Sequence, residues 1–184
     1  SRRRVVEAML DLLDEGQVDP TAQQVADRAE VSLRTVFHHF QSMEVVFTEC
    51  WKLQMERQWS PDRLPRVDPD GPLDQRIHQA VEGRVSLFER IAGPRRAAMH
   101  RAPDSPILAK GLRESAAGLR RLLAETFAPE LEVDDEPEVL LDALDGACSF
   151  EVWDRLRRDG GRSAPATTAV LVRTVTALLT EERP

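Results

Sequence analysis

Apolar residues recur every three or four positions along most of this 184-residue chain, which is the spacing of one face of an α-helix. No stretch alternates regularly between apolar and polar residues, and the chain contains neither an Asn-Gly hairpin signal nor any tyrosine. The pattern therefore predicts an all-α protein of about nine helices. The expected helices cover residues 2–15, 21–29, 32–39, 42–59, 72–92, 94–102, 105–128, 137–159 and 164–181.

The helix boundaries follow from capping residues and from proline and glycine. Thr21 and Gln24 form a capping-box pattern, and Ser32 and Ser42 are N-cap candidates for the next two helices. The segment 60–72, SPDRLPRVDPDGP, is the clearest change in composition. Further breaks are expected at Gly93-Pro94, Pro103, Pro129–Pro137 and Gly160-Gly161.

Two short helices near the N-terminus are separated by only two residues, so they must cross sharply. On the second of them, Val36 and Phe40 face inward with the preceding Val31. The opposite face carries Leu33, Arg34, Phe37 and His38. Exposed apolar side chains beside Arg and His indicate a recognition surface. This is the helix-turn-helix arrangement, in which the second helix enters the major groove of DNA.

The stretch 21–51, TAQQVADRAEVSLRTVFHHFQSMEVVFTECW, resembles the DNA-binding domain of the TetR family of bacterial transcriptional repressors. The matching parts are a Thr-initiated helix with VADRA, then VS..T.F.HF, then a Ser-capped acidic helix start. Beyond about residue 55 only helix number, helix length and a W..LR..GG segment match. The resemblance implies a homodimer with an N-terminal helix-turn-helix domain, here 1–45, and a C-terminal effector-binding and dimerisation domain, here 46–184.

The resemblance also implies partners and site residues. The partners would be double-stranded operator DNA and a small, largely apolar effector, and no cofactor is expected. Thr21 and Gln23 would approach phosphate, and Ser32 is also expected among the DNA-binding residues. The residues expected to reach base edges are Leu33, Arg34 and His38, and those expected to contact the DNA backbone are Thr35, Phe37 and His39.

Three positions depart from the family pattern. Glu30 stands where the family usually has Gly in the turn, and a side chain at positive φ would cost about 1 kcal/mol. Phe37 stands where Tyr is common and Met43 where Lys is common, so two phosphate contacts are missing. Residues 1–50 hold 5 Arg and Lys against 9 Asp and Glu, a formal charge of −4. We therefore expect weak, strongly salt-dependent DNA binding that relies on helix N-termini and on Arg2, Arg3, Arg4, Arg28 and Arg34.

The composition of the whole chain bears on its binding partners, its source and its cellular location. The net charge of −7 argues against general polyanion binding, and we attribute the 23 Arg against 2 Lys to a GC-rich bacterial genome. No apolar run long enough for a membrane span and no signal peptide occur. Cys50 and Cys148 lie far apart in apolar contexts, which favours reduced core thiols and a cytoplasmic location. Arg2–Arg4 would be either a solvated tail or an arm that reaches the minor groove.

Other functions find less support. His38 and His39 diverge by about 100° on a helix, so no metal site is expected, and His39 is either a packing residue or a phosphate contact. No Gly-rich phosphate loop, G-x-S-x-G or H-E-x-x-H motif occurs, so we do not expect an enzyme. The remaining alternative is a ligand-sensing dimer on the same fold with weak or lost DNA binding.

Large apolar side chains beyond residue 50 are core residues by default, and a subset is expected to line an effector pocket. The expected pocket residues are Met55, Trp59, Phe88, Met99, Phe127 and Cys148. Glycines inside expected helices either permit close packing or leave room for a ligand: Gly83, Gly111, Gly118 and Gly146. Polar residues that could orient a ligand, or that are simply solvated, are His78, Glu82, Arg84 and His100.

The segment 139–156 is apolar on nearly all sides, which indicates a helix buried on several faces. Together with the last helix it fits a twofold dimer interface of four helices. The expected interface residues are Phe150, Trp153, Leu156, Leu171, Val175 and Leu178.

Overall fold

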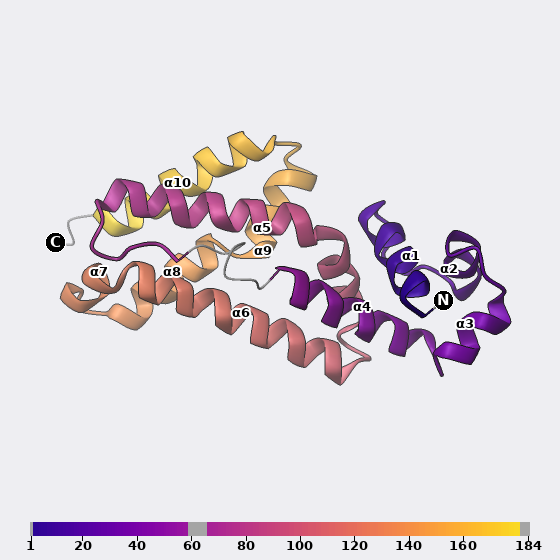
Figure 1. Ribbon diagram of the computed structural model, residues 1–184. Helices are drawn as coiled ribbons and strands as arrows, with labels where there is room; N and C mark the ends of the chain where they lie inside the picture. The colour runs from indigo at the N-terminus through magenta and orange to yellow at the C-terminus, as the bar shows by residue number, and fades with distance from the viewer. Residues whose placement is uncertain (1, 59–65, 181–184) are drawn as a thin grey trace. The chain divides into compact units, whose positions relative to one another are not determined.

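The computed structural model describes residues 2–58 and 66–180 (Figure 1). These residues form helices and no strand, which confirms the all-α class. They fold into ten α-helices and one π-helical turn: α1 (Arg2–Asp14), α2 (Ala22–Arg28), α3 (Leu33–His39), α4 (Met43–Gln58), α5 (Leu73–Arg101), α6 (Pro106–Thr126), α7 (Ala128–Val133), α8 (Pro137–Ala147), α9 (Phe150–Asp154), η1 (Arg155–Asp159) and α10 (Ala164–Thr180).

The chain divides into two compact units. Unit 1 consists of residues 1–60 and 90–115, and unit 2 consists of residues 61–89 and 116–184. Helices α5 and α6 each contribute residues to both units. The domain boundary expected after residue 45 falls inside α4. Unit 1 is larger than the expected N-terminal domain because α4 and parts of α5 and α6 share a core with the first three helices.

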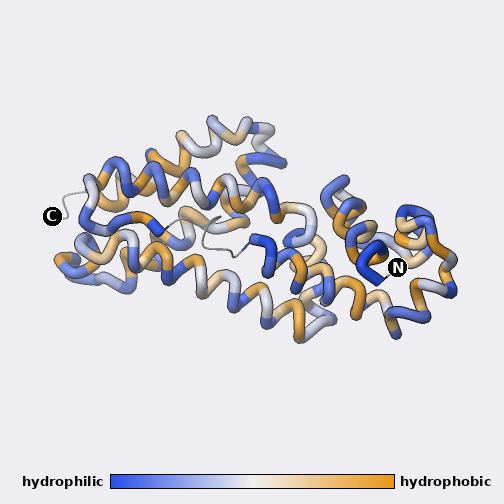
Figure 2. Tube along the Cα trace, viewed as in Figure 1, coloured by the Kyte–Doolittle hydropathy of each residue, from blue (hydrophilic) through white to orange (hydrophobic). Residues whose placement is uncertain are grey.

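The core of unit 1 is built around the apolar stripe of α1. The stripe expected from the sequence, Val5, Met9, Leu12 and Leu13, is buried in full. Figure 2 shows the corresponding mixture of apolar and polar residues along this amphipathic helix. The stripe packs with residues of α2, α3 and α4 and with apolar residues near the junction of α5 and α6.

Two glycines allow helices of unit 1 to meet closely. A Cβ atom on Gly93 would lie 2.3 Å from the carbonyl oxygen of Leu13, and one on Gly111 would lie 2.4 Å from the indole Nε1 of Trp51. Both distances are shorter than any real Cβ contact. Of the two roles that the sequence left open for helical glycines, Gly111 therefore serves close packing.

Helix α5 continues through Gly93-Pro94, where the sequence predicted a break. Proline lacks the N–H that would donate to the carbonyl oxygen of Arg90, four residues earlier. The buried side-chain amide of Gln54 donates to that oxygen instead, with Nε2 at 3.0 Å. The predicted break is wrong because a neighbouring helix replaces the missing hydrogen bond.

Two further boundaries differ from expectation. The segment 129–137, which was expected to be a break, contains most of helix α7, with Pro129 in its first turn, where the proline needs no N–H. The helix expected over 137–159 is divided at Cys148-Ser149. The Ser149 hydroxyl accepts a hydrogen bond from the Val152 N–H at 3.3 Å and begins α9 as its N-cap. A serine after an apolar run carries this capping signal, which the strong apolar pattern obscured.

Three aromatic rings occupy the core of unit 2. Phe88 contacts Phe150 and Trp153, with ring centroids 5.4 and 5.7 Å apart, and the latter two lie 5.2 Å from each other. All three side chains are buried. Each such pair adds about 0.5–1.5 kcal/mol beyond the burial of area.

Two sequence-level expectations about the whole chain concern membranes and thiols. None of the described helices combines the length and apolarity required to cross a membrane. Cys50 and Cys148 are free and buried, and burial raises the pKa of both thiols. A protonated thiol is a weak nucleophile, so both cysteines behave as small core residues.

Candidate nucleic-acid interface

The two helices of the helix-turn-helix segment begin at side-chain caps. The Thr21 hydroxyl accepts from the Gln24 N–H, and the Gln24 amide oxygen accepts from the Thr21 N–H at 2.8 Å, which completes the expected capping box. Ser32 caps α3 by accepting from the Thr35 N–H at 3.1 Å. Both helices therefore begin where the sequence placed them, within one residue.

The turn between α2 and α3 is a Schellman motif. The Val31 N–H donates to the Ala26 carbonyl at 3.0 Å and the Glu30 N–H to the Asp27 carbonyl at 3.1 Å. Glu30 has φ of 53° and is the one non-glycine residue with positive φ in the described part of the chain. The departure noted in the sequence therefore falls on a position that favours glycine.

Arginine side chains of α1 support this segment. Arg4 donates to the carbonyl oxygen of Ala29 at 2.6 Å, and its guanidinium lies 3.4 Å from the Glu30 carboxylate. Arg2 donates to the carbonyl oxygen of His39 at 3.1 Å and lies over the Phe40 ring at 4.6 Å. Both residues belong to helix α1, so the expectation of an N-terminal arginine tail is wrong.

Helix α3 has one buried and one exposed face, as the sequence predicted. Val36 is buried, as is Phe40 just after the helix. On the opposite face Leu33 is 38% exposed and Phe37 is 48% exposed, although both are large and apolar. Arg34, beside them, is also exposed. A helix this short gains nothing for folding from such a face, which fits contact with another molecule.

The other residues expected at the interface lie around this face. Thr21, Gln23, Ser32 and His38 are exposed, and Thr35 and His39 are half-buried. Several are engaged within the chain: the Gln23 amide donates to Asp27 at 2.7 Å, and the Ser32 and Thr35 hydroxyls are 2.8 Å apart. The His38 and His39 rings meet edge to face at 5.3 Å. No group of three metal-ligating side chains gathers anywhere in the described residues.

Most cations of residues 2–58 are paired with carboxylates of the same chain. Residues 2–58 contain seven Arg and Lys, of which six form ion pairs with carboxylates. The strongest geometry is that of Arg28, which donates two hydrogen bonds to Glu15 at 2.8 and 2.7 Å. Arg34 makes no ion pair with any described residue. Met43, one of the two positions at which the sequence lacks an expected phosphate contact, is half-buried and packs against the core of unit 1.

A partly open cavity of about 50 Å³ lies within unit 2. It is lined by Arg66, Val67, Gln79, Ala80, Gly83, Arg84, Leu119, Leu122, Leu123, Glu125 and Thr126. The sequence had singled out Gly83 and Arg84 without ranking them and had missed the α6 leucines. A helical glycine next to an arginine was the available signal, whereas leucines at helical spacing look the same in any core.

The residues expected to form an effector pocket lie elsewhere. Met55 packs on the core of unit 1, and Met99, also in unit 1, is exposed. Phe88, Phe127 and Cys148 are buried in unit 2, and none of them lines the cavity described above. Trp59 falls outside the described residues.

Four of the residues expected at a dimer interface are buried within the single chain. They are Phe150, Trp153, Leu171 and Val175. A side chain buried in its own subunit has no area left for a partner, so the structure contradicts this part of the expectation. Leu156 and Leu178 are half-buried. Val139 and Val152, on α8 and α9, are large apolar residues that remain exposed.

Comparison with known proteins identifies the fold. No family model matches the sequence, and no curated protein matches it. A transcriptional regulator from Rhodococcus sp. Rha1 matches with a TM-score of 0.74 and 21% identity, over 97% of this chain and 96% of that one. A TetR-like transcriptional regulator from Rhodococcus sp. RHA1 matches with 0.71 and 21%, over 98% and 96%. A TetR-family transcriptional regulator from Streptomyces coelicolor matches with 0.69 and 19%, over 96% and 79%. All three are transcriptional regulators, and the chain has the TetR-like fold.

Proposed function

We propose that this chain is a DNA-binding transcriptional regulator, a repressor whose operator affinity changes when a small molecule binds in unit 2. The observation that carries the proposal is the exposed face of α3, where Leu33, Arg34, Phe37 and His38 stand on a capped helix behind a sharp turn. The TetR-like fold over nearly the whole chain supports the same function.

The charge distribution bears on how strongly DNA would bind. Phosphate contacts by free cations supply most of the salt-dependent affinity. Since Arg34 alone among the seven cations of residues 2–58 makes no ion pair with the described residues, the interface has few free charges to offer. We expect weak binding at physiological salt, in which sequence readout by Arg34 and apolar contacts by Leu33 and Phe37 carry a large share.

The regulator would act as a homodimer, because two recognition helices are needed for a palindromic site. The candidate surface is the outer side of α8 and α10, rather than the buried residues first expected. Helix α10 carries a single charged residue, Arg173, along Ala164–Thr180, and Val139 on α8 is 56% exposed. Protein interfaces are depleted of charge in this way. A cytoplasmic location in a bacterium fits both the two free thiols and a DNA target.

The test is fluorescence anisotropy of the purified protein with the intergenic DNA upstream of its own gene, from low to physiological salt. We expect Arg34→Ala to weaken binding by about 10- to 100-fold and to flatten the salt dependence. Arg113→Ala is the matched control, because Arg113 is an exposed cation of unit 1 outside the helix-turn-helix segment. An equal loss in both variants would mean that binding is nonspecific.

A second candidate function is favoured by the paired cations and by Glu30 in the turn. It is a ligand-sensing dimer that has lost useful affinity for DNA. An intact dimer that shows no anisotropy change at low salt, with and without ligand, would favour it over the regulator.

A further inference from the structure

Gly83 marks the unit 2 cavity as a space that the fold leaves unfilled. It lies in the interior of α5, where glycine is less stable than alanine. An added Cβ at Gly83 would meet no atom within 4 Å, whereas one at Gly93 of the same helix would collide with Leu13. Packing against a neighbour therefore does not explain the glycine at position 83. Its effect is to keep the wall of the cavity open.

Arg84, the next residue, places a buried cation at the same cavity. Its side chain is 7% exposed and donates to the carbonyl oxygens of Cys148 and Leu119 and to the Asp145 carboxylate at 3.5 Å. A guanidinium has five N–H donors, so these three hydrogen bonds leave two that no described residue accepts. Burial lowers the pKa of Arg84, which means that its present partners compensate the charge only in part.

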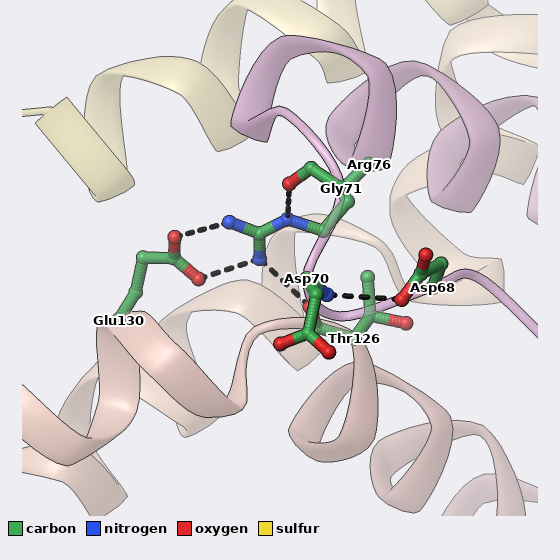
Figure 3. A network of polar contacts seen from close by, with 6 residues as sticks. All are labelled: Asp68, Asp70, Gly71, Arg76, Thr126 and Glu130. Atoms are coloured by element: carbon green, nitrogen blue, oxygen red, sulfur yellow. Dashed lines mark hydrogen bonds and ion pairs between the residues drawn. The ribbon is translucent and has the colours of Figure 1, made fainter.

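Arg76 of the same helix shows what full compensation looks like (Figure 3). It forms two hydrogen bonds with the Glu130 carboxylate, at 2.7 and 2.5 Å, and donates to the carbonyl oxygens of Gly71 and Thr126 at 2.8 Å each. Its pKa is raised, chiefly by the hydrogen bonds with Glu130. Arg84 is equally buried, but its one carboxylate contact is a single hydrogen bond to Asp145 at 3.5 Å.

The rest of the cavity lining includes both charged and apolar residues. Arg66 is exposed and makes no ion pair with the described residues, while Glu125 is exposed and therefore screened by solvent. The apolar part of the lining comes mainly from three residues of α6, Leu119, Leu122 and Leu123. A ligand that fits this wall has one anionic group and a short hydrocarbon body.

We propose that the unit 2 cavity binds a small monocarboxylate, with Arg84 holding the carboxylate and the α6 leucines contacting the hydrocarbon part. The inference deepens the effector part of the proposed function and replaces the largely apolar effector expected from the sequence. Bidentate contact between guanidinium and carboxylate is a strong charge-assisted interaction in a buried site.

The test is titration calorimetry and thermal unfolding of the DNA-free protein with butanoate, hexanoate, octanoate and the neutral analogue hexanamide. At about 100 times Kd an acid raises Tm by about 5–10 °C. Affinity rises about fourfold per methylene while the chain still meets the leucines. Hexanamide binds at least tenfold more weakly than hexanoate. No binding by any of the acids, or equal binding of hexanoate and hexanamide, would overturn the proposal.

Variants identify the site. Gly83→Leu fills the cavity and abolishes binding of hexanoate without loss of stability. Gly146→Leu is its matched control, because Gly146 is a helical glycine whose added Cβ also meets nothing within 4 Å, and it does not line the cavity. Arg84→Lys keeps a charge but loses the fork geometry, and it weakens hexanoate at least tenfold. Unchanged binding in Gly83→Leu would place the ligand elsewhere and refute the assignment.

A final experiment tests carboxylate binding separately from the proposed regulatory function. Saturating hexanoate is added to the protein–DNA complex in the anisotropy assay. A change in operator affinity that Gly83→Leu removes supports both ideas. Binding of hexanoate with no change at the operator would leave the carboxylate site standing and refute its role in regulation.

Discussion

The two units hold their helices together by different means. In unit 1, Gly93 and Gly111 bring helices against a backbone and an indole ring with no spare volume. In unit 2, Arg76 and Arg84 lie buried between helices and bind their carbonyl oxygens, and Gly83 faces open space. The difference teaches where each unit is vulnerable. At Gly93 and Gly111 unit 1 leaves no room for an added atom, whereas at Gly83 unit 2 does. We expect unit 2 to lose stability when a buried charge loses its partner.

The largest effect is expected for Gly93→Ala. A methyl group 2.3 Å from the Leu13 carbonyl oxygen forces two backbones apart, which no side-chain rotation can relieve. We expect a loss of at least about 3 kcal/mol in the free energy of unfolding, or roughly 6–12 °C in Tm. Gly83→Ala provides the contrast: it should gain up to about 1 kcal/mol. Equal stability of the two variants, measured by thermal denaturation, would contradict the contrast between tight packing at Gly93 and open space at Gly83.

The next effect is expected for Glu130→Gln in unit 2. It leaves the buried Arg76 with only carbonyl partners, which should cost about 2–3 kcal/mol. The exposed pair of Arg120 and Glu138 is the control, and Glu138→Gln should change stability by less than about 0.5 kcal/mol. Comparable losses in both variants would contradict the importance of the buried charge.

The same ion pair predicts a pH dependence. Hydrogen bonding to Arg76 lowers the pKa of Glu130 in the folded state. Its stabilisation is therefore fully present above the unfolded pKa of about 4.3 and is lost as the pH falls through the lower folded value. Between pH 5 and pH 3, as about the range to scan, wild-type Tm should fall more steeply than that of Glu130→Gln. Parallel curves would count against the pair.

A smaller effect is expected for Gln54→Leu in unit 1. The variant leaves the Arg90 carbonyl oxygen without the donor that compensates for Pro94, at a cost of about 1–2 kcal/mol. Pro94→Ala restores a backbone N–H, so the loss from Gln54→Leu should shrink in that background. A double-mutant cycle by urea unfolding measures the coupling, expected at about 1 kcal/mol. Strictly additive losses would show that the two residues act independently.

The sequence predicted correctly those features that depend on residues close together in the chain. Helices α1 to α4, the caps at Thr21 and Ser32, and the two faces of α3 depend on residues within four positions of one another. The fold class follows from the same periodicity. The exposed face of α3 could be identified because a helix of two turns cannot bury Phe37 and Val36 on the same core.

The sequence failed where the partner lies far along the chain. Pro94 continues a helix because Gln54 supplies a donor, and Gly83 faces a cavity whose apolar wall belongs to α6. Trp153 was assigned to a dimer interface but packs on Phe88 inside the subunit. An apolar pattern predicts that a helix is buried but does not identify the element that covers it. Residues of the interior and of a subunit interface therefore look alike in a sequence.

The smallest expected effect is a gain, for Glu30→Gly in the turn of unit 1. Glycine adopts positive φ without the steric cost that a side chain incurs, so the variant should be more stable by about 0.5–1 kcal/mol, or roughly 1–4 °C in Tm. The exposed pair with Arg4 contributes little and should not reverse the sign. Glu30→Gln keeps the backbone strain and removes only the charge, so its Tm should stay near that of the wild type.

The two variants of Glu30 also separate strain from charge at the DNA surface. Each removes one negative charge beside the recognition helix, so both should bind operator DNA more tightly at low salt and to a similar degree. Only Glu30→Gly should gain stability as well. A rise in affinity confined to Glu30→Gly would mean that the strained turn, and not the charge, limits how α3 meets DNA. In that case unit 1 would be constrained in its backbone at the interface just as it is at Gly93 in its core.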